Sequence, residues 1–222
     1  NENTCAVIIE PIQGESGILP ATQEYLQAAR RLCDEHGALL ILDEVQTGMG
    51  HTGKLFAYEH YGITPDIISS AKALGGGFPI GAILTTDKIA PTFGPGTHGS
   101  TFGGNPMACA VGSRAFDIIN APETLAHVEK QGQKLQTTLR ELGDKTGVFK
   151  EVRGMGLLIG CVLADQYKGR ASEITAAALK HGLMVLVAGA DVVRFAPSLL
   201  LNDEDMEEGL KRLEAALTEW LV

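Results

Sequence analysis

The chain has 222 residues, of which 45% are hydrophobic and 20% are charged, and its formal net charge at pH 7 is −9. A chain of this size and composition can bury a hydrophobic core in one large or two modest domains, which argues against intrinsic disorder. The negative charge argues against nucleic acid or an anionic membrane as a partner, because no basic patch could easily dominate that field. No apolar run approaches the ~18 residues of a membrane-spanning helix.

Residues 1–119 alternate short runs of β-branched residues with helical patterns, which is typical of parallel strands joined by crossover helices. A helix is predicted over residues 22–36, with a threonine as its N-cap and a glycine after its last turn. A second helix is predicted over residues 105–119, where an Asn-Pro pair supplies the cap and the first turn. Strands are predicted over residues 6–9, 38–42, 67–68 and 81–85.

The pattern changes after Ile119, where we place a domain boundary, so that residues 120–222 are predicted to form a separate α+β domain. The last helix of this domain is indicated by apolar residues that recur every three or four positions, at Met206, Leu210, Leu213, Leu217 and Trp220. The other predicted elements are a long amphipathic helix after residue 122, strands over 148–152, 157–163, 184–187 and 192–195, and a helix over 171–181.

The four cysteines, Cys5, Cys33, Cys109 and Cys161, are far apart and form no C-x-x-C pair. We expect them to be reduced thiols of a cytoplasmic protein, most of them in the core. Neither the cysteines nor the six histidines show the spacing of metal ligands, so no metal is predicted.

A candidate ligand site begins at Asp43, because open α/β sheets bind ligands beyond the carboxyl ends of their strands. On position alone, Asp43 could equally cap a loop or pair with an arginine. Lys72 follows another predicted strand among small residues, with three glycines behind it, so that a planar ring could approach its amine. A strand-end aspartate and such a lysine together suggest pyridoxal phosphate, whose pyridinium nitrogen requires an anionic partner and whose aldehyde requires an amine.

A nucleotide-binding module is the lower-ranked alternative, because Gly48 to Lys54 matches G-x-G-x-x-G and the first seven places of a P-loop. The hydroxyl residue that a P-loop requires next is Leu55 here. The acidic pair Asp43 and Glu44 stands between the strand and the glycines, where it would repel a pyrophosphate. We therefore interpret this segment as a glycine turn.

Five segments of the chain resemble class III (ω-) aminotransferases, and most closely the bacterial acetylornithine and succinylornithine transaminases. These segments are EPIQGE at residues 10–15, LDEVQTG at 42–48, SAKALGGG at 70–77, GSTFGGNP at 99–106 and VRFAP at 193–197. The resemblance implies an α/β protein of the pyridoxal-phosphate-dependent transferase fold type I. Residues 1–119 would be part of the large parallel or mixed-sheet domain with a connecting helix, and residues 120–222 the C-terminal small domain.

The resemblance also implies how the cofactor is held. Lys72 would carry pyridoxal phosphate and act as the general base and acid of the proton shift. Asp43 would pair with the pyridinium N–H, Val45 would pack on the ring face, and Gln46 would hydrogen-bond near the phenolic oxygen.

Four further residues receive implied roles from the same resemblance. Ser100 and Thr101 would reach the phosphate of the neighbouring subunit's cofactor, which implies a homodimer with shared active sites. Arg194 would bind the α-carboxylate of 2-oxoglutarate or glutamate with two hydrogen bonds. Glu15 would pair with Arg194 while a δ-amine substrate is bound and would move aside for glutamate.

The expected activity is transfer of the δ-amino group of N2-acetyl-L-ornithine to 2-oxoglutarate in arginine metabolism, with N-succinyl-diaminopimelate as a further substrate. The alternative within the family is succinylornithine transaminase of arginine catabolism. The chain starts without methionine, and we expect it to be the carboxy-terminal half of the enzyme. One departure from the family pattern is His51, which stands where an arginine is expected in the glycine turn.

Overall fold

The computed structural model describes all 222 residues, which divide into two compact units. Unit 1 contains Asn1–Pro11, Ala21–Gly50 and Lys54–Pro122, and unit 2 contains Ile12–Pro20, His51–Gly53 and Glu123–Val222. Two short early segments therefore belong with the later part of the chain. Sequence patterns could not predict this, because neither segment is long enough to show a period.

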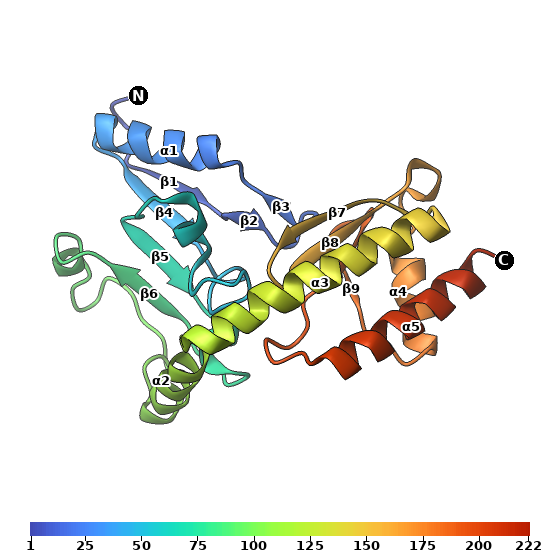
Figure 1. Cartoon of the computed structure of the whole chain (residues 1–222). Helices are drawn as coiled ribbons and strands as arrows, with labels where there is room; N and C mark the ends of the chain where they lie inside the picture. The colour runs from blue at the N-terminus through green and yellow to red at the C-terminus, as the bar shows by residue number, and fades with distance from the viewer. The chain divides into compact units, whose positions relative to one another are not determined.

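Unit 1 is built on a four-stranded sheet in the order β1-β4-β5-β6 (Figure 1). The strands are β1 (Ala6–Ile9), β4 (Leu39–Asp43), β5 (Ile67–Ser70) and β6 (Ala82–Thr85). The pairs β1–β4 and β4–β5 are parallel, whereas β6 runs antiparallel to β5. All four strands predicted for this region are present, in a mixed sheet.

The helices of unit 1 begin and end at residues whose side chains or backbone favour those positions. Helix α1 (Gln23–His36) starts where the Thr22 side chain accepts a hydrogen bond from the Tyr25 N–H, at 3.2 Å. It ends at Gly37, whose φ of 67° lies in the left-handed region. Helix α2 (Pro106–Ile119) starts where Asn105 accepts from the Ala108 N–H, at 2.9 Å. The predicted limits of both helices are confirmed. The shorter 3₁₀ helices of this unit are η1 (Ala57–Tyr61), η2 (Lys72–Gly75) and η3 (Ala90–Thr92).

Unit 2 contains a second four-stranded sheet, in the order β7-β8-β10-β9, with antiparallel neighbours throughout. Its strands are β7 (Phe149–Met155), β8 (Leu158–Leu163), β9 (Leu186–Val187) and β10 (Val192–Phe195). A separate hairpin pairs β2 (Ile12–Gln13) with β3 (Leu19–Pro20). The helical elements are α3 (Pro122–Thr146), η4 (Asp165–Tyr167), α4 (Ala171–Lys180) and α5 (Asp203–Trp220) (Figure 1). No helix in the structure combines the length and the apolar character that crossing a membrane requires.

Both faces of the second sheet are covered, which explains why all six residues of β8 are buried. Side chains alternate between the faces of a strand. Ile159, Cys161 and Leu163 belong to the larger core, together with residues of α3 and α5. Leu158 and Val162 belong to a smaller cluster that includes Ile12 and Ile18 of the hairpin region. The hairpin therefore lies on the face of the sheet opposite to the long helices.

The cysteines are divided between the core and the surface. Cys33 and Cys161 are buried, and burial raises the pKa of both thiols. Cys5 and Cys109 are exposed. The expectation that most of the cysteines lie in the core is wrong, because two of the four, Cys5 and Cys109, are exposed although they stand beside apolar residues in the sequence.

Candidate active site

Asp43 is the last residue of β4 and pairs in register with Ser69 of β5. The Ser69 hydroxyl and the Val45 N–H both donate to the Asp43 Oδ1 atom, each at 3.0 Å. The carboxylate is therefore fixed at the carboxyl end of two parallel strands, where this class of sheet binds ligands. Because both hydrogen bonds use Oδ1, Oδ2 can accept from a further donor.

Lys72 lies two residues after β5, at the start of η2, and its amine donates a hydrogen bond to the side-chain oxygen of Gln46. This contact connects the segments that follow β4 and β5. Lys72 is exposed, and its backbone has a φ of 47°, in the left-handed region that residues with a Cβ seldom adopt. Such a conformation costs about 1–3 kcal/mol and is concentrated at functional sites.

Glu44 is a residue whose importance the sequence did not reveal. It is only 1% exposed, and its carboxylate accepts from the Thr47 hydroxyl and from the N–H groups of Ala57 and Tyr58, the latter two at 2.9 and 2.8 Å. Burial raises the pKa of Glu44, and these hydrogen bonds oppose that shift. Glu44 therefore fixes the loop that carries Val45 and Gln46. Its donors come as late as 14 residues downstream, so no local motif announces them.

Ser100 and Thr101 lie in an exposed loop that precedes α2. The Ser100 hydroxyl accepts a hydrogen bond from the Gly103 N–H at 3.0 Å. Neither residue is hydrogen-bonded to Asp43 or Lys72, so within this chain the two hydroxyl groups lie outside the hydrogen-bonded group of the candidate site.

Arg194 and Glu15 are brought together in unit 2, although they are 179 residues apart in the chain. The Nη1 group of Arg194 donates to Glu15 Oε1 at 2.6 Å and to the Gly14 carbonyl at 2.9 Å. The arginine is 9% exposed, whereas the Glu15 side chain is 70% exposed. The Nε of Arg194 is buried and has no hydrogen-bond partner. This is a buried cation with a counterion that solvent reaches and with donor capacity left for an anion.

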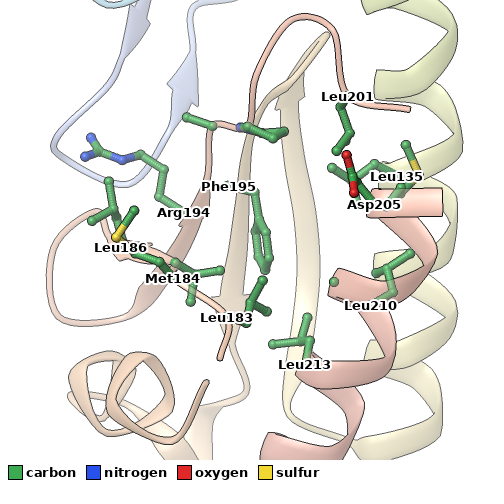
Figure 2. A pocket seen from close by; sticks show the side chains of 15 residues that line it. Leu135, Leu183, Met184, Leu186, Arg194, Phe195, Leu201, Asp205, Leu210 and Leu213 are labelled. Atoms are coloured by element: carbon green, nitrogen blue, oxygen red, sulfur yellow. The ribbon is translucent and has the colours of Figure 1, made fainter. Parts of the chain in front are cut away.

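The strand β10 borders an apolar cavity of unit 2, and Arg194 is one of the residues that line this cavity. Figure 2 shows the Arg194 guanidinium pointing away from its neighbour Phe195. Phe195 lies beside this cavity of about 190 Å³, whose lining is mostly aliphatic and includes Leu183, Leu210 and Leu213. The guanidinium group of Arg194 pairs with Glu15.

The glycine turn lacks the context that a nucleotide site requires. Met49, Gly50 and Gly53 all have positive φ, and the segment remains a turn. The next helical element is the five-residue η1, which starts at Ala57. Both nucleotide motifs depend on a helix whose N-terminus follows the glycines directly. The nucleotide-binding alternative therefore has no structural support.

The residues of unit 1 fit pyridoxal phosphate by the chemistry of their functional groups. Asp43 offers a fixed carboxylate with one oxygen available, and Lys72 offers an exposed amine next to the end of the neighbouring strand. These are the anionic and amine partners that the ring nitrogen and the aldehyde require. The chemistry of these two residues and the mixed sheet are those expected of a pyridoxal-phosphate-dependent transferase of fold type I.

Comparison with known proteins places the chain within a family. Residues 1–217 match the model of the family Aminotransferase class-III, so the chain belongs to the class III aminotransferases, which are pyridoxal-phosphate-dependent enzymes. The acetylornithine aminotransferase of Neisseria meningitidis serogroup B is 82% identical over 219 residues, which cover 99% of this chain and 55% of that protein. The succinylornithine transaminase/acetylornithine aminotransferase of Pseudomonas aeruginosa is 57% identical, with 99% and 54% covered.

The structural comparison agrees with the family. The crystal structure of N-acetylornithine aminotransferase from Stenotrophomonas maltophilia matches with a TM-score of 0.92 and 46% sequence identity, and it covers 99% of this chain and 58% of that one. The chain spans about half the length of the curated relatives it matches. The resemblance and the fold class predicted from the sequence are confirmed.

Proposed function

We propose that the full-length protein transfers the δ-amino group of N2-acetyl-L-ornithine to 2-oxoglutarate. The observation that carries this proposal is the pair formed by buried Arg194 and exposed Glu15. A transaminase of this substrate class must accept glutamate, which brings a carboxylate to the site, and a terminal amine, which brings none. A buried arginine with a displaceable counterion meets both requirements. The identity of 82% to a protein named acetylornithine aminotransferase supports the same substrate.

The proposed roles in unit 1 concern the cofactor. When bound, pyridoxal phosphate supplies an aldehyde for the amine and a ring that withdraws electrons from the reacting carbon. Asp43 would keep the ring nitrogen protonated through its available Oδ2. Lys72 would hold the cofactor and then move a proton at the reacting carbon as general base and acid. Gln46 would orient the Lys72 amine through the hydrogen bond that joins them.

The proposed roles in unit 2 concern the substrate. Arg194 would bind the carboxylate of glutamate or 2-oxoglutarate with two parallel hydrogen bonds, for which its buried Nε is available. Glu15 would neutralise Arg194 while a δ-amine substrate is bound. Because the Glu15 side chain is 70% exposed, water screens the pair, and its contribution to the stability of the fold should be less than about 1 kcal/mol.

Several finer features belong to the same proposal. The active unit would be a cytoplasmic homodimer in which Ser100 and Thr101 contact the phosphate of the other subunit's cofactor. Residues 1–119 would contribute to the large cofactor-binding domain, and residues 120–222 would form the small domain. N-succinyl-diaminopimelate would be a further substrate. Succinylornithine is the alternative main substrate, since the relative from P. aeruginosa carries both names.

The test is a steady-state assay of the full-length protein with 2-oxoglutarate and either N2-acetylornithine or N2-succinylornithine, with glutamate as the measured product. We expect a higher kcat/KM for N2-acetylornithine and no glutamate from Lys72→Ala. The matched control is Lys54→Ala, which removes another exposed lysine of unit 1 and should retain activity. Preference for N2-succinylornithine would select the alternative, and full activity of Lys72→Ala would reject the proposal.

A further inference from the structure

Two arginines of unit 2 stand on the same face of the sheet, on either side of one glycine. In the strand register, Gly160 of β8 pairs with Arg153 of β7 and also with Arg194 of β10. Residues paired in register on neighbouring antiparallel strands project from the same face. Both side chains therefore leave the sheet on either side of Gly160, which contributes no side chain of its own.

The space above Gly160 is filled by the turn that joins β2 to β3. A Cβ placed on Gly160 would lie 2.8 Å from the Cβ of Ile18, which is closer than real Cβ atoms approach. Ile18 is fully buried, and its φ of 50° is unusual for a β-branched residue. The turn is therefore seated on the sheet in one defined position, and Glu15 is part of that turn.

Arg153 binds one end of this turn. Its Nε donates to the carbonyls of Gly17 and Ile18, at 3.0 and 3.1 Å, and its Nη2 donates to Gly17 at 2.8 Å. Its Nη1 donates to Glu151 at 3.2 Å. The Arg153 side chain is 22% exposed, and its hydrogen bonds to the carbonyls of Gly17 and Ile18 are part-buried, whereas the one to Glu151 is exposed.

Arg194 binds the other end of the same turn, through the Gly14 carbonyl and the Glu15 carboxylate. The Glu15 side chain is 70% exposed. Its position depends on the backbone that carries it. Holding that backbone removes conformational entropy before Glu15 pairs with Arg194, which favours the pair.

We propose that Arg153 is a positioning residue that sets the substrate preference of the Glu15–Arg194 pair. Glu15 and a substrate carboxylate compete for Arg194. By fixing the turn that carries Glu15, Arg153 favours Glu15 in this competition. The intact turn therefore favours substrates that bring no carboxylate to Arg194 and disfavours those that do. This proposal rests on the function proposed above and adds a residue that controls it from outside the pair.

The test is Arg153→Lys in the full-length protein, because lysine keeps the charge but lacks the planar fork that binds both carbonyls. The measured quantity is kcat/KM for N2-acetylornithine divided by kcat/KM for glutamate. We expect this ratio to fall about tenfold, within the range of coupling between residues that share a partner. Glu15→Gln should lower the same ratio, and the double variant should fall no further than Glu15→Gln alone.

The matched control is Arg212→Lys. Arg212 also donates to a carboxylate and to a backbone carbonyl, those of Glu208 and Gly182, but it lies on α5. Its substitution should leave the ratio unchanged. If Arg153→Lys does not fold, Ile18→Val loosens the same turn by one methyl group, and the ratio should fall by a smaller factor.

A binding measurement separates failure of this inference from failure of the proposed function. Glutarate, a dicarboxylate that does not react, should bind more tightly to Arg153→Lys than to the wild type, by a few-fold in calorimetry, since Glu15 competes less. If the wild type converts neither amine, the proposed function fails, and the glutarate result alone decides the role of Arg153. Equal losses for both substrates, additive effects in the double variant, or unchanged glutarate binding would each overturn the inference.

Discussion

The two units place their functional groups by different physical means. In unit 1, Asp43 and Lys72 follow the ends of adjacent parallel strands, and buried Glu44 fixes the loop between them. In unit 2, Arg194 and Glu15 meet across 179 residues, on the face of an antiparallel sheet. The first arrangement depends on local backbone geometry, and the second depends on how a short turn packs on a completed sheet.

The charged side chains of the two units also differ in their exposure and in their partners. Lys72 is exposed and donates to a neutral amide, so its amine is accessible to a reacting group. Arg194 is buried and paired with a carboxylate, so a substrate carboxylate would compete with one that is already present. In the proposed function, the reacting group of unit 1 is accessible to solvent, whereas the binding group of unit 2 is already paired with a carboxylate.

The variant with the largest expected loss of stability is Glu44→Ala, which removes the hydrogen bonds that hold the loop after β4. Glu44→Ala leaves the buried N–H groups of Ala57 and Tyr58 without their acceptor, and we expect a loss of about 3 kcal/mol in the free energy of unfolding. Urea unfolding of the full-length protein measures it. The control is Glu59→Ala, which removes an acceptor from the Phe56 N–H near the surface and should cost about 1 kcal/mol or less. Equal effects would mean that Glu44 does not organise the loop.

Gly160→Ala disturbs the packing of the β2–β3 turn on the sheet of unit 2. Gly160→Ala would place a Cβ 2.8 Å from Ile18 and 3.0 Å from Val192, and we expect a loss of about 1–3 kcal/mol together with weakened selectivity. Thermal unfolding measures the loss of stability, and the ratio of kcat/KM for N2-acetylornithine to kcat/KM for glutamate measures the selectivity. Gly209→Ala in α5 is the control, since its Cβ would meet only Leu183 at an ordinary 3.7 Å, and it should stabilise the helix by about 0.5–1 kcal/mol. A stable, selective Gly160→Ala protein would contradict the packing argument.

The pH dependence of stability tests whether burial raises the pKa of Glu44. Burial raises the pKa of Glu44 above its ordinary value of 4.5, so the folded state binds its proton more tightly than the unfolded state. The stabilisation from this proton is complete below pH 4.5 and is lost as the pH rises through the folded-state pKa. As the pH rises through that interval, we expect the wild type to lose stability relative to Glu44→Gln, which does not titrate at this position. A constant difference across a pH series of urea unfolding curves would be inconsistent with the raised pKa.

The smallest expected effect concerns the stability of unit 2. Glu15→Gln keeps an oxygen for Arg194 at an exposed position, and we expect a change of less than about 1 kcal/mol in unfolding free energy. Its effect on carboxylate binding should be much larger. If stability falls by several kcal/mol instead, the pair serves mainly the fold, and its role in selectivity loses support.

The sequence predicted elements whose signals are local. The limits of α1 and α2 follow from Thr22, Gly37 and Asn105, whose capping hydrogen bonds span a few residues. The direction of β6 could not be predicted, because a short strand of this composition can pair in parallel or antiparallel. The hairpin of β2 and β3 was not predicted, since two-residue strands show no alternation.

The candidate site was predictable to a similar extent. Asp43 and Lys72 were identified from strand ends and small neighbours, which are visible in the sequence. The proximity of Glu15 to Arg194 came only from the family resemblance, because nothing local connects residues so far apart. Glu44 and Arg153 were missed, since their importance lies in hydrogen bonds to backbone groups of distant segments.

Lys72 is proposed to carry the cofactor, and covalent labelling can identify the lysine that does so. The full-length protein is incubated with pyridoxal phosphate, reduced with borohydride, digested and analysed by mass spectrometry. We predict a phosphopyridoxyl group on the peptide that contains Lys72 and no specific label in Lys72→Ala, with Lys54→Ala labelled as the wild type. A stable label on another lysine, or an unlabelled Lys72 peptide, would contradict the account.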